Sequence, residues 1–354
     1  MMPTTIAVPP RVHPLRKPKG FEPAVQRWSV AVPAKYDRYQ VVFLGIQASR
    51  ADDIAASPFR SWIEGAFART DGPIAQDNAR HVDEAGLTNH IVAAYWLDAA
   101  AFASWSACDA VAGFWDDPAR RDGSCGYFRE SMMVPVERQE TIYWQDFPAA
   151  LSRSNEVSIY PTPYCGYYGA MRDRLPIAAS DSLESPLPPQ LARITGHAGK
   201  GERLRVRPPK NFAVIRSGVY WGGCDDEQRD DFMQNLRAPL ENGMQFLRGN
   251  AAETGCCSLR YQQTCDPAGS FALETHALGY FLSLPHLENW AERHESHHAI
   301  FSSAIARYRK YGAANQLRTW HEVYVLPEDG GVFDYINCTP TTGLLPWFEA
   351  ERLH

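Results

Sequence analysis

Two stretches of the chain, 90–105 and 275–290, carry the same arrangement of residues, and this repeat constrains the fold more than any other feature. The first reads HIVAAYWLDAAAFASW and the second reads THALGYFLSLPHLENW. In each stretch a tyrosine is followed ten residues later by a tryptophan, and the pair brackets an aromatic residue, a leucine and a helix start. Each stretch is typical of a strand, a turn and a helix, so the repeat predicts two related halves.

The regions around the repeat suggest where the halves begin and end. Residues 1–36 contain seven prolines and predict an irregular N-terminal arm that lies over the surface. The stretch 176–210 is rich in Pro, Ser, Gly and charge, which is typical of a connector. We therefore expect the halves at 37–175 and 211–354, within one compact domain.

The remaining patterns indicate the fold class. YQVVFLGIQ (39–47) reads as a buried strand, and 138–144, 211–221 and 321–327 read as hairpin-like strands. Strand–helix units mixed with such strands predict an α+β fold, a duplicated ferredoxin-like arrangement with an antiparallel sheet core and flanking helices.

Composition limits the classes of partner. The chain has 354 residues, 45% of them hydrophobic, so it can bury a large core. Its net charge of −6 gives no basic footprint, which argues against nucleic acid as a partner. No run of eighteen apolar residues and no signal-like N-terminus is present, so we expect no membrane association.

The eight cysteines occur without a C-x-x-C pair. The absence of this motif argues against a zinc knuckle and against covalent attachment of haem. Reduced, mostly buried thiols predict a cytoplasmic protein. Cys165 and Cys338 lie in or near segments discussed below, but an axial thiolate is a weaker candidate for metal binding than the histidines that follow.

The segment WAERHESHHAIF (290–301) gathers His294, His297 and His298 on what reads as one amphipathic helix. His294-Glu295-Ser296-His297-His298 formally matches H-E-x-x-H, in which two histidines one turn apart bind zinc and the glutamate activates water. A second interpretation makes His297 the axial ligand of a haem. A third is an ordinary helix with one core histidine and two solvated ones.

The helical face favours haem over zinc. At a spacing of 3.6 residues, His297 falls in the middle of an apolar stripe, with Ile300 beside it, and a buried porphyrin needs such a surface. A zinc site needs His294 and His298 together, and His298 lies about 100° further round the helix than His297, off the centre of the stripe. The zinc interpretation remains open at this point as an alternative.

Five segments in sequence order resemble the aldoxime dehydratases, haem enzymes that convert R–CH=N–OH into a nitrile and water. The resemblance covers about residue 36 to 345. It implies a haem fold of the dimeric α+β barrel type, non-covalent haem b between the central sheet and the helix with His297, a ferrous working state, a homodimer and a small-molecule aldoxime substrate. The segments are RQETIYW (138–144), YYGAMRDRLPI (167–177), RSGVYW (216–221), WHEVYV (320–325) and FDYINCTP (333–340).

The resemblance assigns His321 as the distal acid–base histidine and Ser217 as the distal serine. In WHEVYV, His321 shares a strand face with Val323 and Val325, and an imidazole can give and take a proton near neutral pH. Ser217 would share a face with Ile215, and its hydroxyl could orient an oxime oxygen.

The resemblance also places Arg174 and Glu140 at the active site. Arg174 is expected to orient the oxime or the distal histidine, or to hold a haem propionate, and Arg172 would take this role if the match is shifted by two residues. Glu140 is expected to tune His321 or to relay protons.

Three function classes are consistent with these patterns. The first is a haem lyase that dehydrates aldoximes, with His297 on the iron and catalysis by His321, Ser217, Arg174 and Glu140. The second is a zinc metallopeptidase built on the HESHH segment, with His294, His298 and a third ligand such as His321 on the zinc and Glu295 as base. The third is a haem-binding protein without catalytic activity, because related haem folds host different reactions.

Overall fold

The structure, a computed structural model, describes residues 10–353, so the first nine residues of the expected arm lie outside the described residues. The first half of the described chain alternates strands and helices in the order strand, helices, two strands, helices, strand. Its elements are β2 (Arg38–Ala48), α1 (Ala51–Ala56), α2 (Phe59–Phe67), β3 (Ala75–Val82), β4 (Thr88–Trp96), α3 (Ala99–Ala107), α4 (Asp109–Asp116) and β5 (Gly126–Pro135).

The second half repeats this order. Its elements are β9 (Ala213–Tyr220), α6 (Asp226–Asn235), α7 (Arg237–Gly249), α8 (Ala251–Thr254), β10 (Cys256–Cys265), β11 (Phe271–Phe281), α9 (Leu284–Arg293), α10 (Glu295–Tyr311) and β12 (Arg318–Val325). The elements outside the repeat are β1 (Arg27–Ala31), β6 (Gln139–Ile142), β7 (Ser158–Thr162), α5 (Ala170–Arg174), β8 (Arg203–Val206), β13 (Gly331–Ile336) and β14 (Glu351–Arg352).

One antiparallel sheet runs through both halves. Within residues 10–353 its strands follow the order β14-β8-β13-β5-β2-β4-β3-β10-β11-β9-β12-β6. The halves contribute β5-β2-β4-β3 and β10-β11-β9-β12, so each has the β-α-β-β-α-β connectivity of a ferredoxin-like unit. They join where β3 pairs with β10. The expected antiparallel sheet with flanking helices is confirmed.

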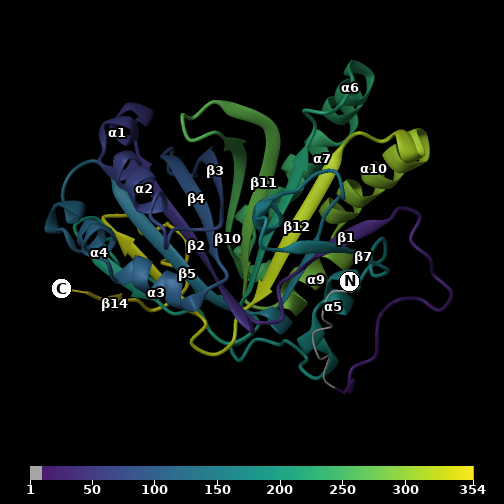
Figure 1. The fold of residues 1–354 in the computed structure, drawn as a ribbon, viewed down its shortest axis with the longest axis horizontal. Coiled ribbons are helices and arrows are strands. Elements are labelled where there is room, and N and C mark those ends of the chain that lie inside the picture. The colour runs from purple at the N-terminus through teal and green to yellow at the C-terminus, as the bar shows by residue number, and fades with distance from the viewer. Residues whose placement is uncertain (1–9, 354) are drawn as a thin grey trace.

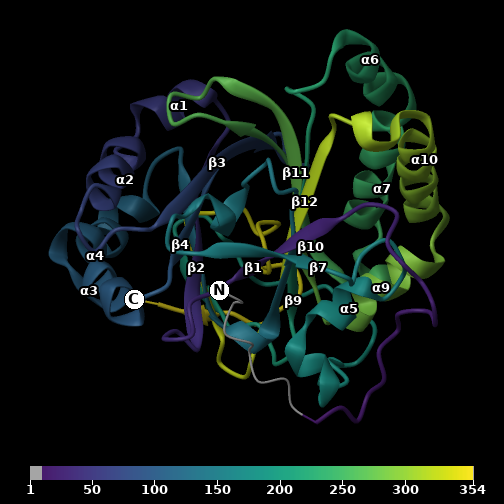
Figure 2. The same cartoon turned by 45° about the vertical axis from the view of Figure 1, so that its right-hand side comes forward.

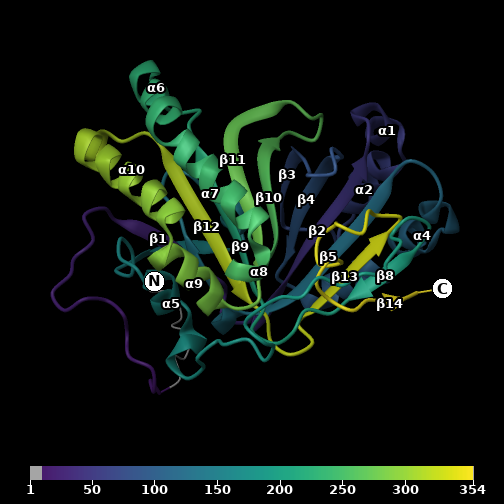
Figure 3. The same ribbon diagram turned by 180° about the vertical axis from the view of Figure 1, so that it is seen from behind.

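Helices cover the two outer faces of this sheet, and the inner faces of the two halves share one core. Helices α1–α4 lie outside the first half, and α6, α7, α9 and α10 lie outside the second (Figure 1). The same arrangement is seen from behind, where α7 and α10 lie side by side along β9–β12 (Figure 3). Inner-face residues such as Phe43, Phe128, Tyr280 and Tyr324 pack together in the core between the halves.

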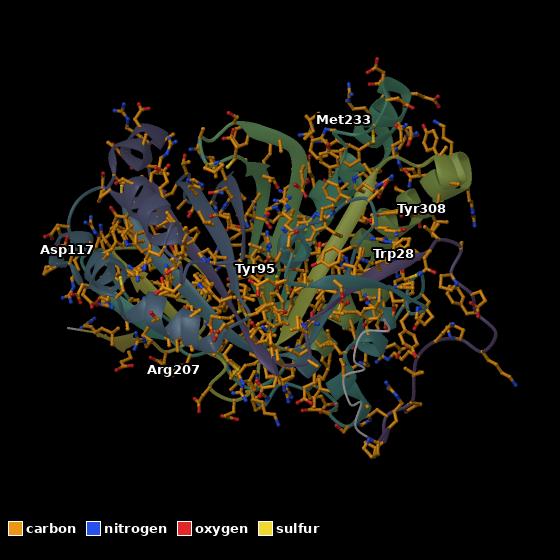
Figure 4. The ribbon with its side chains drawn as sticks, in the orientation of Figure 1. Trp28, Tyr95, Asp117, Arg207, Met233 and Tyr308 are labelled. Atoms are coloured by element: carbon orange, nitrogen blue, oxygen red, sulfur yellow. The ribbon has the colours of Figure 1, made fainter. Side chains whose placement is uncertain are left out.

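Two buried glutamates connect the halves reciprocally. In the first half, strand pairing leads from Tyr95 of β4 across β2 to the region of Glu130 in β5. In the second half, it leads in the same way from Tyr280 of β11 across β9 to the region of Glu322 in β12. The two glutamates therefore occupy equivalent positions. Tyr95, at the centre of the molecule (Figure 4), donates to Glu322 at 2.8 Å, and Tyr280 donates to Glu130 at 2.5 Å. Each half therefore supplies a hydroxyl to the carboxylate of the other.

Protein groups supply two hydrogen bonds to each oxygen of the Glu322 carboxylate. It also accepts hydrogen bonds from the hydroxyls of Tyr143 (2.7 Å) and Tyr324 (2.5 Å) and from the backbone N–H of Leu151 (2.9 Å), while Arg216 lies 3.6 Å away. Burial and the nearby Glu322 carboxylate hold the pKa of Tyr143 well above its usual value, so the hydroxyl remains a donor. Such a network fixes the strand that carries it.

Two segments that the sequence suggested were irregular contribute strands. The arm contains β1, which pairs with β7 in a two-stranded sheet that crosses the second half (Figure 2). Here the alternation of RWSVA, with Trp28 and Val30 apolar, outweighs the nearby prolines. The connector contains β8, in which Leu204 and Val206 are buried and Arg205 pairs with Asp334. No helix in the part of the chain described is long and apolar enough to cross a bilayer.

Replacing Glu322 with glutamine should destabilise the fold by about 2–4 kcal/mol, because a neutral amide removes one of the two carboxylates beside Arg216 and puts an NH₂ group against tyrosine donors. Glu64→Gln, which removes an exposed ion pair with Arg60, is the control and should change stability by less than about 0.5 kcal/mol. Equal effects of the two substitutions in urea unfolding would contradict this account of the core.

Candidate active site

A cavity of about 590 Å³ lies between the outer face of the second half of the sheet and helices α7, α9 and α10. Most of its wall is apolar and comes from both layers. Representative lining residues are Ile215, Leu259, Ala277, Met244, Trp290 and Ile300. A cavity of this size and character can take a largely apolar molecule that is positioned by a few polar groups.

Ser217 and His321 enter this cavity from the sheet as direct neighbours. They are register partners between β9 and β12, so their side chains share one face. Ser217 is exposed although it lies within a central strand, because the cavity leaves its face uncovered. As expected, Ser217 lies on the same side as Ile215, which also lines the cavity.

Glu140 and Arg174 meet at His321. Glu140 lies on β6, the strand next to β12, and Arg174 ends α5. Arg174 donates from Nε to Glu140 Oε2 at 2.6 Å, and its Nη2 lies 2.9 Å from His321 Nε2. Glu140 Oε1 is also 2.9 Å from that nitrogen. Burial alone would raise the pKa of Glu140, but Arg174 and His321 outweigh it and lower that pKa, so the carboxyl stays ionised.

The structure separates Arg174 from Arg172. Arg172 donates from Nε and Nη2 to Glu288 at 2.6–3.1 Å and from Nη1 to the carbonyl of Ser182 at 2.9 Å. The guanidinium beside His321 is therefore that of Arg174. Because Glu140, His321 and the carbonyl of Tyr164 engage Arg174, its expected use as a propionate partner is not supported.

The expectation of one continuous helix through the three histidines is wrong. Helix α9 ends at Arg293 and α10 begins at Glu295, with His294 extended between them. His294 caps α10, since its Nδ1 accepts from the backbone N–H of Ser296 at 3.2 Å, and its ring stacks on Phe246 at 3.7 Å. This local cap and stack outweigh the helical pattern that the sequence suggested.

The break removes the geometry that a zinc site needs. His294 and His298 do not lie one turn apart on one helix, and His298 is exposed with its Nε2 at 2.8 Å from the carbonyl of Glu292. His321, the suggested third ligand, is held by Glu140 and Arg174 instead. Across residues 10–353, no group of three or more His, Cys, Asp or Glu side chains is placed to hold a metal ion.

His297 alone among the three lines the cavity, from the first turn of α10. Its ring meets the edge of Trp290 at 4.8 Å, and its Nδ1 is buried without a hydrogen-bond partner among the described residues. Burial lowers the pKa of His297 to about 4, although interaction with the carbonyl of Ala291 opposes the shift. The imidazole is therefore neutral, the form that binds a metal.

These features fit a haem. One neutral histidine reaches the cavity from the helical wall, the lining is apolar, and the polar pair Ser217 and His321 comes from the sheet wall. His297 would hold the iron, and Ser217 and His321 would contact a small molecule bound in the same cavity.

Sequence reasoning missed one wall of the cavity. Phe21, Val25 and Arg27 line it, although they belong to the arm that was expected to lie over the surface. The alternating apolar residues of β1 were the signal that this part of the arm packs against the rest of the fold. Cys165 also lines the cavity, whereas Cys338 is buried elsewhere and donates to the carbonyl of Tyr127.

Comparison with known proteins agrees with this geometry. Residues 42–344 match the haem-containing dehydratase family. The chain belongs to this family. It is 33% identical to phenylacetaldoxime dehydratase of Bacillus sp. (strain OxB-1) and 32% identical to aliphatic aldoxime dehydratase of Pseudomonas chlororaphis, with 95% of each chain covered in both cases.

Solved structures support the same assignment. A crystal structure of aldoxime dehydratase superimposes with a TM-score of 0.86 at 32% identity and 95% coverage of both chains. A structure of aldoxime dehydratase in complex with butyraldoxime gives the same TM-score at 31% identity, covering 95% of this chain and 93% of the other. The cofactor of this haem-containing dehydratase is therefore haem.

His297→Ala should weaken haem binding by more than about 100-fold, since loss of even an outer partner of a metal ligand costs about 10- to 100-fold. His298→Ala is the matched control, because that side chain is exposed, and it should change the affinity by less than about twofold. Titration of each apo-protein with haem, followed at the Soret band, measures both. Loss of haem only in His298→Ala would contradict the assignment.

Haem capture by the apo-protein should persist in mild acid. With a pKa of about 4, His297 is still mostly neutral at about pH 5. An ordinary histidine would be mostly protonated at that pH, and the affinity for haem would fall about 30-fold. We expect the affinity at about pH 5 to be within about twofold of that at about pH 7. The unfolded chain binds the extra proton, so the stability contributed by His297 falls as pH drops from about 6.5 to 4.

Proposed function

We propose that this protein is an aldoxime dehydratase, a lyase that uses non-covalent haem b to convert aldoximes into nitriles and water. The observation that carries the proposal is the placement of Ser217 and His321 as neighbours on one wall of the cavity that His297 also lines. The names of the relatives support the reaction type, because they include both aliphatic aldoxime and phenylacetaldoxime dehydratases.

His297 would hold the iron, and the substrate would contact Ser217 and His321 on the sheet wall of the cavity. When bound in the ferrous state, haem supplies coordination of the oxime nitrogen and electron density that weakens the N–O bond. The remaining task falls to the chain. It must hold the oxime hydroxyl, protonate the oxygen that leaves as water, and accept the proton of the C–H group.

Ser217 and His321 supply these functions in our proposal. The hydroxyl of Ser217 orients the oxime oxygen by a hydrogen bond. His321 gives a proton to that oxygen as the N–O bond breaks, and then accepts the C–H proton as the nitrile forms, so the imidazole ends in its starting state. Because Arg174 and Glu140 both lie 2.9 Å from Nε2 of His321, Nδ1 is the ring nitrogen that would serve the substrate.

Glu140 and Arg174 act as positioning residues for His321. The Glu140 carboxylate and the Arg174 guanidinium each lie 2.9 Å from Nε2 of His321. Two contacts to one ring nitrogen fix the orientation of the imidazole toward the substrate.

We further propose a cytoplasmic homodimer. The eight cysteines are free, and most are buried, which suits a reducing compartment. The proposed dimer rests on the resemblance to the family, and sedimentation analysis of the holoprotein would test it.

An absorption experiment tests the proposed function. The purified holoprotein should show a Soret band that shifts on reduction with dithionite and shifts again when phenylacetaldoxime or butyraldoxime is added. Nitrile should then accumulate in the same sample. Haem binding without nitrile from either substrate would indicate a carrier and would overturn the proposal, as would a colourless protein that fails to take up added haem.

His321→Ala should lower kcat by about 10²- to 10⁴-fold, the range that general acid–base groups contribute. Ser217→Ala should lower kcat/KM by about 10- to 100-fold through loss of one hydrogen bond to the reacting oxygen. Ser302→Ala, on the exposed side of α10, removes a similar hydroxyl and should change neither constant by more than about twofold. Equal losses in all three variants would contradict the assigned roles.

A further inference from the structure

Arg27 of β1 places a guanidinium on the cavity wall without a carboxylate partner. Its Nε donates to the carbonyl of Tyr143 at 3.1 Å, and its two terminal nitrogens donate to the hydroxyl (3.3 Å) and carbonyl (2.5 Å) of Thr319. Among the described residues no Asp or Glu lies within ion-pair distance of it. Since a guanidinium has five N–H donors, two remain for a ligand.

Among the described residues, the fully buried arginines each have a carboxylate partner; they are Arg138, Arg216, Arg260 and Arg307. Arg260 is paired with Glu130 at 2.6 Å, and this partner raises its pKa even though burial opposes the shift. Burial instead lowers the pKa of Arg27, because only weak opposing interactions, the first from Tyr308, act on it. A charge in such a place is most stable when an anion joins it.

The surroundings hold Arg27 in place and leave its free donors to the cavity. Its guanidinium lies over the ring of Trp144 at 4.7 Å, and Tyr308 of α10 stacks on the same ring at 6.4 Å between centroids. Tyr308 and Trp28, the neighbour of Arg27, lie on the same side of the molecule (Figure 4). Arg318 lies over Trp144 at 4.8 Å, but Asp146 already pairs with it.

The position of Thr319 on β12 determines how far Arg27 lies from the distal histidine, His321. Thr319 and His321 are two residues apart on one face of β12, so Arg27 at Thr319 is displaced by about 7 Å along the strand from the distal histidine. That separation equals the length of a short alkyl or aryl spacer. The hydroxyl of Thr319 accepts from Arg27, so its own hydrogen can be donated to a ligand.

We propose that Arg27 and Thr319 bind a carboxylate on the substrate, so that this protein acts on aldoximes that carry an acidic group one short spacer away from the oxime. The inference deepens the proposed function and rests on it. A carboxylate matches the two remaining N–H groups of the guanidinium and the Thr319 hydroxyl, whereas a purely apolar substrate would leave the charge without a partner.

The test compares an acidic ligand with its neutral counterpart on the holoprotein. The substrates are the oxime of glutaric semialdehyde and its methyl ester, and the non-reacting ligands are the corresponding cyano-carboxylate and its methyl ester. Calorimetry gives affinities for the nitriles without turnover, and nitrile formation gives kcat/KM for the oximes. We expect the acid to be preferred about 10- to 100-fold in both measurements, the range for a charged hydrogen-bonded pair.

Arg27→Met should abolish that preference. Arg27→Lys should retain part of it, because an ammonium keeps the charge but lacks the paired N–H donors with which a guanidinium binds a carboxylate. Arg318→Met is the matched control, since it removes a guanidinium from the other side of Trp144 that is already paired, and should leave the preference within about twofold. The Lys variant also keeps the test interpretable if the Met variant folds poorly.

Three results would overturn the inference. They are equal binding of acid and ester by the wild-type protein, an equal loss for both ligands in Arg27→Met, and reduced haem affinity in that variant with an unchanged preference. The last result would mean that Arg27 binds a haem propionate. If the cyano-carboxylate binds through Arg27 but no oxime is dehydrated, the proposed function fails while the carboxylate site stands.

Discussion

The buried carboxylate of Glu322 determines much of the geometry of the site. Three tyrosine hydroxyls and a backbone N–H fix it in the core between the halves, and Tyr95 among them comes from the other half. Successive residues of a strand point to opposite faces, so holding Glu322 inward turns His321 toward the cavity. The same interaction therefore joins the halves and orients the distal histidine.

The repeat also explains why one half carries the site. By the ladder register, Leu44 of β2 occupies the position that Ser217 occupies in β9. In the first half the space under the helices is filled by large side chains such as Trp96, Trp105 and Trp115, which pack with Leu44 in one core. In the second half the corresponding space is the cavity. One half stabilises the fold by close packing, and the other leaves room for a ligand.

The sequence was informative where a pattern is local. Alternation predicted the central strands and the faces of Ser217 and His321, and resemblance supplied Arg174 and Glu140, which the structure brings together. Local pattern failed at His294, where a cap and a ring stack end the helical register. It also missed Arg27, because its place on the cavity wall depends on β1 pairing with the distant β7. The alternation in β1 indicates a strand, but it does not indicate the distant strand with which β1 pairs.

The central claim is that one haem lies between His297 on the helical wall and the Ser217–His321 pair on the sheet wall. A crystal structure of the reduced holoprotein with a bound aldoxime tests it most directly. The account predicts iron bound to His297, the oxime nitrogen on the opposite side, and the oxime hydroxyl within hydrogen-bond reach of both Ser217 and His321. Iron bound to another side chain, or an oxime that contacts neither residue, would contradict it.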